Sequence, residues 1–200
     1  VGSEMCIRDR RTYGHFRLTG VEIATLDEDC KSISKSCMRV DCDLLAISGG
    51  WSPNIHLHLH TGGRPIFSDS IAAFIPDKSQ QGEQIIGAAA GVFSLHECLL
   101  SGRDAGCNAA QMMGFSSAPL ELPVTRNDAK WSIKPLWQVP GRGTKFVDLQ
   151  DDVTSDDIDL AHLEGYVSME HLKRYTTLGM GTDQGKTSNM NGHAIMADKR

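Results

Sequence analysis

A glycine-rich segment near the C-terminus combines residue types that suit the binding of an anionic group. Residues 173–189 read KRYTTLGMGTDQGKTSN. Glycines free the backbone N–H groups to approach a phosphate, and neighbouring donors and a cation add to such a site. The Walker pattern G-x-x-x-x-G-K-[ST] does not fit the spacing. A phosphate-binding loop and an ordinary polar surface loop are both compatible with the segment, whose candidate contacts are Thr182, Gln184 and Lys186.

A second candidate site follows two short apolar runs. Residues 43–48 and 85–86 predict strands that are buried on both faces, as in a parallel sheet. Ligands of open α/β sheets bind at the carboxyl ends of such strands. A long helix is predicted over 92–113, and its N-terminus suits a pyrophosphate. The small residues at the two strand ends are therefore candidate dinucleotide contacts, with a tight packing turn without ligand as the alternative: Gly49, Gly50, Gly87, Ala88, Ala89 and Gly91.

Histidines and cysteines are the residues that could bind a metal. His56, His58 and His60 alternate with leucines, which predicts one face of a strand. Three ligands in line along a strand span too far to meet one ion, so we interpret them as a polar strand face. The six cysteines contain no C-x-x-C pair and predict free thiols of a cytoplasmic protein. We expect no metal, and no common site for Cys30, Cys37 and Cys42.

Length and composition describe an ordinary globular protein of one large or two small domains. The chain has 200 residues and a formal net charge of -5. This charge argues against a nucleic-acid partner, which needs a basic face. No apolar run approaches the ~20 residues that span a bilayer, so we expect no membrane partner.

The elements that must position these residues follow in order along the chain. Residues 1–15 are interpreted as a non-native or disordered leader, and residues 16–24 alternate as a half-buried strand. A polar loop is predicted over 27–36. The dinucleotide-binding part then runs to residue 115, so that the predicted domain covers 16–115.

The rest of the chain predicts a connector and a small helical module. Residues 116–145 hold four of the seven prolines, which forbid a continuous helix. The tryptophans in this connector need cover, so we expect it to wrap on a neighbouring surface. In the module, 146–200, a Thr154–Asp157 capping box opens a helix that Gly165 ends, and Ser168 caps a second helix. The glycine loop follows directly.

Residues 146–189 closely resemble the alpha subunit of the heterotetrameric sarcosine oxidases. Residues 42–54 and 85–110 also resemble that subunit and, more distantly, the pyridine nucleotide-disulfide reductases, in which a strand ends in G-x-x-P-N. The resemblance covers nearly everything from residue 16 onward. It implies an α/β fold with a partial Rossmann-like dinucleotide-binding domain, followed by the helical module.

The resemblance implies a flavoenzyme that demethylates sarcosine to glycine, passes the one-carbon unit to tetrahydrofolate and reduces oxygen to hydrogen peroxide. In that family the alpha subunit binds NAD and faces an FMN shared with the beta subunit, which itself holds FAD. Gamma and delta subunits complete the oligomer. We therefore expect NAD near the turn at 87–91 and FMN near Thr182, Gln184 and Lys186, with the glycine loop exposed when the other subunits are absent.

Two departures from the family pattern matter. The reductases usually have Gly-Asp where this chain has Gly87-Ala88, so the backbone must replace a carboxylate contact. The G-x-G-x-x-G fingerprint and the folate-binding region are missing, which indicates an internal fragment without catalytic residues for amine oxidation.

One alternative function is the alpha subunit of a related proline or opine dehydrogenase. An alternative of another class is a non-enzymatic metal-binding or interaction module built on the cysteines and the three histidines.

Overall fold

The computed structural model describes residues 7–27, 32–116, 118–125, 133–141 and 143–200. It divides into two compact units, one formed by Val1–Ala46 with Pro135–Arg200 and the other by Ile47–Lys134. The second division, after residue 134, falls inside the predicted connector. The first, after residue 46, differs from the predicted domain over 16–115, because residues 16–46 belong with the C-terminal residues.

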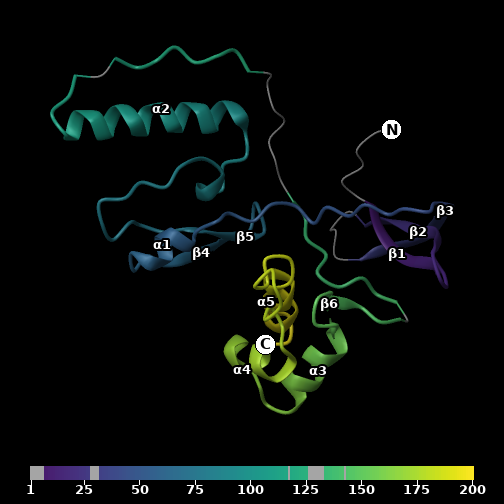
Figure 1. The fold of residues 1–200 in the computed structure, drawn as a ribbon. Coiled ribbons are helices and arrows are strands. Elements are labelled where there is room, and N and C mark those ends of the chain that lie inside the picture. Colours follow the sequence, from purple (N-terminus) through teal and green to yellow (C-terminus); the bar gives the residue numbers. More distant parts are fainter. Residues whose placement is uncertain (1–6, 28–31, 117, 126–132, 142) are drawn as a thin grey trace. The chain divides into compact units, whose positions relative to one another are not determined.

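The N-terminal part of the first unit is an antiparallel sheet of three strands in the order β1-β2-β3 (Figure 1). These strands are β1 (Ile7–Gly14), β2 (Leu18–Leu26) and β3 (Ile33–Val40). In the central strand, Val21 lies opposite Thr12 on one side and Val40 on the other. The predicted strand over 16–24 is confirmed as β2. The predicted loop over 27–36 is wrong from residue 33, and the disordered leader is wrong for residues 7–14.

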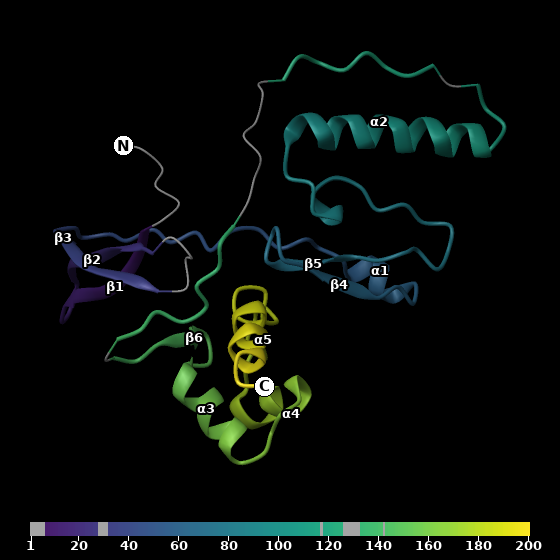
Figure 2. The same ribbon diagram turned by 180° about the vertical axis from the view of Figure 1, so that it is seen from behind.

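The C-terminal part of the first unit contains two short paired strands and three helices. They are β6 (Phe146–Asp148), β7 (Val153–Thr154), α3 (Ser155–Leu163), α4 (Met169–Thr176) and α5 (Asn189–Ala197). The views from the front and from behind show the three helices side by side (Figures 1 and 2). The predicted helical pair is confirmed, and α5 is a third helix that the sequence analysis did not predict.

Local sequence explains where these helices begin and end. Thr154 and Asp157 form a reciprocal capping box at the start of α3, as predicted. Ser168 accepts a hydrogen bond from the His171 N–H at the start of α4, also as predicted. Gly165 follows the end of α3 with φ +92°, a conformation that glycine adopts without strain.

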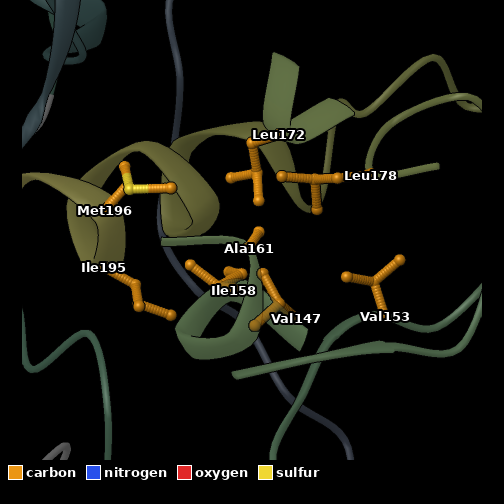
Figure 3. Packing of buried hydrophobic residues seen from close by; sticks show 8 residues of the cluster. All are labelled: Val147, Val153, Ile158, Ala161, Leu172, Leu178, Ile195 and Met196. Carbon is orange, nitrogen blue, oxygen red and sulfur yellow. The ribbon is translucent and has the colours of Figure 1, made fainter. Parts of the chain in front are cut away.

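Apolar side chains from all of these elements meet in one cluster (Figure 3). Ile158 on α3, Leu172 on α4 and Leu178 in the glycine loop are each 0% exposed. Trp137 of the connector and Met169 pack against the outside of the cluster, so the predicted cover for the connector tryptophans is confirmed at Trp137. Trp131 lies outside the described residues. The remaining members of the cluster are Val147, Val153, Ala161, Ile195 and Met196.

The second unit contains a short helix, a hairpin, a 3-10 turn and one long helix. Its elements are α1 (His56–His60), β4 (Pro65–Ser68), β5 (Ala73–Pro76), η1 (Gly87–Ala90) and α2 (Leu95–Met112). β4 and β5 pair antiparallel. The long helix predicted over 92–113 is confirmed as α2, with its start at Leu95 because Ser94 is the N-cap.

Several predicted strands are absent from the described residues. Residues 43–48 and 85–86 are irregular, and residues 56–60 are helical. All paired strands in the described ranges are antiparallel. The mixed α/β class is therefore confirmed, but the predicted parallel strands are wrong. An apolar run needs a neighbouring strand to complete its ladder, and neither run has one here. Within the described parts of the chain no helix is long and apolar enough to cross a membrane.

Candidate functional site

The glycine loop, residues 177–188, connects α4 to α5 and is held at both ends by one side chain. Asp148 at the end of β6 accepts a hydrogen bond from the Gly179 N–H (2.8 Å) and from the Ser188 hydroxyl (3.0 Å). Its other carboxylate oxygen accepts from the Gln150 N–H at 2.9 Å. Asp148 and Ser188 are both buried. The strand β6 therefore fixes where the loop begins and ends.

Asp148 is buried as an ionised group. Burial alone would raise the pKa of this carboxyl, but hydrogen bonds from the backbone of Gly179 and Gln150 and from Ser188 outweigh burial and hold the pKa below its usual value. No salt bridge to Asp148 occurs among the described residues. Neutral donors alone therefore stabilise the charge.

The loop glycines make room for side chains of this chain itself. A Cβ on Gly179 would lie 2.2 Å from the Asn189 amide oxygen, and one on Gly185 would lie 2.2 Å from the Asn189 amide carbon. A Cβ on Gly181 would lie 2.6 Å from a Gln150 side-chain oxygen. Gly179 and Gly185 also have positive φ angles of 71° and 75°. Beside these glycines the space is therefore filled by Asn189 and Gln150 of this chain and is not open to a ligand.

The loop is exposed only in part, whereas we expected an exposed segment. Leu178, Gly179, Gly185 and Ser188 are buried. The Asp183 carboxylate accepts from the Gly185 N–H (2.9 Å) and from the Thr187 hydroxyl (2.7 Å). These bonds hold the pKa of Asp183 below its usual value, with the Thr187 bond the larger cause. The loop thus has an internally bonded conformation, although its outer residues face solvent.

Three predicted site residues form that outer surface. Thr182, Gln184 and Lys186 are all exposed. Gln184 has φ +53° and its side-chain amide donates to the Gly181 carbonyl at 2.9 Å. In the part of the chain that the structure describes, no carboxylate forms a salt bridge with Lys186. The structure therefore places these three residues on the exposed part of the loop, and their role in a site stays a prediction.

The second predicted group lies on the 3-10 turn η1 and the residues around it. Gly87 begins the turn with φ +60°, and a Cβ there would lie 3.6 Å from the Cys98 sulfur, in the first turns of α2. Gly91 ends the turn with φ +83°, and a Cβ there would lie 2.8 Å from Ile75 of β5. Ala88 is exposed and Ala89 half-buried. The turn is therefore beside the start of α2, as predicted, but residues 91–94 separate it from the helix.

Gly49 and Gly50 do not end a strand, because residues 43–48 have no ladder. Both are exposed, and Gly50 has φ +101°. The next residue, Trp51, lies near Phe93, with ring centroids 6.5 Å apart. This contact brings the segment that follows Gly50 to the loop between η1 and α2. The shared position of Gly49, Gly50 and the turn at 87–91 in one site stays a prediction.

The three histidines do not share a strand face. They occupy alternate positions of α1, where His58 is 1% exposed while His56 and His60 are exposed. A helix rotates successive residues by about 100°, so residues two apart point away from each other. Among the described residues no group of three histidines, cysteines or carboxylates is arranged to hold a metal ion. Cys30 lies outside those residues, so the prediction about Cys30, Cys37 and Cys42 stays a prediction.

The sequence analysis missed the side chains that organise the glycine loop. Asp148 stands between Val147 and Leu149, and a carboxylate at the end of a strand that enters the core was the available signal. Asn189 gave no signal in isolation. A cavity of about 570 Å³ lies elsewhere in the first unit, lined in part by Arg10, Trp137 and Lys145, and none of the nine predicted site residues lines it.

Known proteins resemble this chain in both fold and sequence. The crystal structure of L-proline dehydrogenase from P. horikoshii matches 96% of this chain with a TM-score of 0.63 and 20% sequence identity, over 38% of that chain. Residues 142–200 match the model of the sarcosine oxidase A3 domain.

Two relatives are more similar in sequence. Sarcosine oxidase subunit alpha from Rhizobium meliloti (strain 1021) is 42% identical over 160 residues, which cover 79% of this chain and 16% of that subunit. The subunit from Corynebacterium sp. (strain P-1) is 35% identical over 191 residues, 90% of this chain and 19% of that subunit. The chain thus spans less than a fifth of the length of these relatives.

The fold and the two glycine-containing turns define a mixed α/β protein with the fold of part of a dehydrogenase chain. The A3 match places the Asp148-anchored loop inside a named domain, and the sequence identity extends over most of the chain. The chain belongs to the sarcosine oxidase alpha-subunit family and corresponds to a part of that subunit.

Proposed function

We propose that this chain is part of the alpha subunit of a cytoplasmic, heterotetrameric, flavin-dependent sarcosine oxidase. The enzyme would convert sarcosine to glycine, with the one-carbon unit passing to tetrahydrofolate and oxygen reduced to hydrogen peroxide. The partners of this chain would be the beta, gamma and delta subunits, with FAD and the site of amine oxidation in the beta subunit. Tetrahydrofolate would bind outside the residues present here.

The glycine loop carries the proposal for FMN. Its conformation is fixed from within by Asp148 and Asp183, so Thr182, Gln184 and Lys186 are presented outward without first having to be ordered by a ligand. A cation and two polar side chains on one surface fit a phosphate or the electron-rich edge of a flavin ring. FMN, when bound, would supply the electron transfer, and Lys186 would bind and orient it at the interface with the beta subunit.

Replacement of Lys186 by Ala in the assembled oligomer tests this proposal. FMN content should fall several-fold while FAD content and subunit composition stay unchanged, because the variant removes a charge from an exposed side chain without touching the core. Arg174→Ala is the control, since Arg174 is an exposed cation on the adjacent helix, 3.9 Å from Glu170. Unchanged FMN content in the Lys186 variant would contradict the assignment.

The turn at 87–91 carries the proposal for NAD. Gly87, Ala88, Ala89 and Gly91 contribute only backbone and methyl groups, and the first N–H groups of a 3-10 turn have no partner within the turn. Small residues with accessible backbone fit a pyrophosphate. Gly49 and Gly50 would add further backbone contacts, since the adjacent Trp51 reaches Phe93 beside the turn.

Ala88→Glu tests the NAD assignment, because Ala88 is exposed and the longer side chain brings a negative charge to the turn without overpacking. NAD should bind about tenfold more weakly to the assembled oligomer, by repulsion between like charges. Ala88→Ser is the matched control and should bind NAD as the parent does. Equal affinity in the Glu variant would remove the turn from the NAD site.

An alternative of the same reaction class is the alpha subunit of a proline or opine dehydrogenase. The structural similarity to L-proline dehydrogenase favours keeping this alternative. Turnover of sarcosine, L-proline and an opine by the assembled oligomer separates the two functions. Activity with sarcosine alone supports the proposal, and activity with L-proline or the opine alone supports the alternative.

A further inference from the structure

A buried histidine connects the short helix α1 to the loop that leads into the turn at 87–91. The Nδ1 atom of His58 lies 2.8 Å from an Oε1 oxygen of Glu83. The Thr61 hydroxyl lies 2.7 Å from the same oxygen. His58 is buried and Glu83 half-buried, so a partly buried hydrogen bond joins α1 to the loop.

The backbone around Gly63 fixes the orientation of the imidazole. A Cβ on Gly63 would lie 2.1 Å from the ring, so that no other residue fits this position without moving it. The Gly63 N–H donates to the His58 carbonyl at 3.1 Å. Hydrogen bonds from Thr61 and His58 hold the pKa of Glu83 below its usual value, so the carboxylate is ionised and only accepts. Nδ1 therefore carries the proton, and the buried Nε2 has no hydrogen-bond partner in the described structure.

The loop makes two further hydrogen bonds near Glu83. The Gln81 side chain donates to the Thr61 carbonyl at 3.4 Å, and the Glu83 N–H donates to the Gln81 carbonyl within the loop. Glu83 precedes Gly87 by four residues, and an extended chain spans at most about 3.6 Å per residue. The Glu83 contact therefore restrains the beginning of the turn, while Gly91 packs against Ile75 at its end.

We propose that His58, Thr61 and Glu83 are positioning residues for the turn at 87–91. They hold its upstream end on α1, as the hairpin holds its downstream end, so that the backbone N–H groups of the turn keep one arrangement. No atom of the three needs to contact the ligand. That this ligand is NAD rests on the function proposed above, whereas the restraint on the turn does not.

Two substitutions at His58 distinguish the hydrogen bond from simple filling of space. His58→Leu replaces the imidazole by an apolar side chain of similar volume and so removes the donor. His58→Asn places an amide nitrogen near the position of Nδ1 and keeps a donor to Glu83. His60→Leu is the matched control, because His60 is exposed on the same helix. All are made in the assembled oligomer.

Amide hydrogen exchange over residues 84–91 and the affinity for NAD are measured together. His58→Leu should exchange about tenfold faster over this segment and bind NAD more weakly by a similar factor. His58→Asn should recover most of both, and His60→Leu should change neither. If the Leu variant does not fold, Glu83→Ala against Glu83→Gln asks the same question at a half-exposed position, where the Gln amide oxygen still accepts.

The outcomes separate this inference from the NAD assignment. Unchanged exchange over 84–91 in His58→Leu, or in Glu83→Ala, overturns the positioning role whatever the NAD affinity. Faster exchange with unchanged NAD affinity supports the positioning role and overturns the assignment of the turn to NAD. Equal effects of the Leu and Asn variants also overturn the inference, because they would show that only the shape of the side chain matters.

Discussion

Asp148 shows how a single buried carboxylate can organise a loop that is distant in sequence. It accepts hydrogen bonds from Gln150, two residues later, and from Gly179 and Ser188, which come after α3 and α4 in the sequence. Hydrogen bonds to a charged group are worth roughly twice those between neutral groups. The side chain that shapes the outer loop surface therefore lies inside the core and not on that surface.

Replacement of Asp148 by Ala should destabilise the first unit strongly. The Gly179 N–H and the Ser188 hydroxyl would be left buried without an acceptor, at a cost of about 3 kcal/mol in free energy of unfolding. Urea unfolding followed by the fluorescence of Trp137, in a background with Phe at the other two tryptophans, measures this loss. Asp151→Ala is the control, because the Asp151 side chain is exposed, and it should cost little. Equal stability of the two variants would contradict the role given to Asp148.

Acid should weaken the first unit through the same residue. The pKa of Asp148 in the folded chain is below its ordinary value of 3.8. A group with a depressed pKa contributes stability that is complete above the unfolded pKa and is lost as pH falls through the folded pKa. Parent unfolding free energies measured between pH 5 and about pH 2 should therefore fall more steeply than those of Asp148→Asn. Parallel pH dependences of the two proteins would contradict this prediction.

At the scale of elements, the N-termini of α3 and α4 allow a direct comparison of two N-caps. In α3 the Thr154 N–H and hydroxyl both donate to the Asp157 carboxylate, at 2.8 and 2.7 Å, and the Asp157 N–H donates back at 3.3 Å. In α4 Ser168 accepts one bond, from the His171 N–H at 3.2 Å. The capping box also follows Val153 of the core, whereas Ser168 is half-buried.

Thr154→Ala should therefore cost more stability than Ser168→Ala. We expect about 1.5 kcal/mol for the first and about 0.7 kcal/mol for the second, within the usual range for caps. Chemical unfolding of the two variants beside the parent protein gives the order. A larger loss for Ser168→Ala would show that the reciprocal bonds at Thr154 do not act as a unit.

Elements whose signals are local were predictable from the sequence, and those that depend on distant partners were not. The caps at Thr154 and Ser168 act within one helical turn, so three or four residues suffice to identify them. Residues 43–48 have the composition of a buried strand, but a strand exists only where a second one pairs with it. The strand predicted from the alternating histidines was wrong for a related reason. A segment of five residues fits the period of a strand and the length of a short helix equally well.

The third helix and the interior of the loop were missed for a different physical reason. Gly192 in α5 lowers helix propensity, yet the structure needs it because a Cβ there would lie 2.5 Å from Leu178. Likewise, Gly179 and Gly185 give space to Asn189. Gly192 and Gly179 thus serve contacts with residues ten or more positions away, which a local pattern does not show. The exposure of Thr182, Gln184 and Lys186 could be predicted because polar and charged residue types favour solvent.

At the scale of the whole molecule, the apolar cluster around α3, α4 and α5 is confined to a short stretch of sequence. Its eight buried members all lie between Val147 and Met196, and the A3 match covers 142–200. The sheet of β1, β2 and β3 contributes none of them. A module with all its core residues in one continuous segment needs no long-range closure to fold.

We therefore predict that residues 135–200 fold alone, and that the connector contributes to their stability. A domain of about 60 residues buries only ~60% of its unfolded surface, so each additional apolar contact matters. Trp137 packs against the outside of the core, and its partial burial should contribute about 2 kcal/mol. The peptide 135–200 should then unfold cooperatively in urea, as followed by the circular dichroism of its helices. The shorter peptide 142–200 and the Trp137→Ala variant of the longer one should both lose about that amount. Equal stability of the two peptides would show that the family boundary at residue 142 already encloses the whole folding unit.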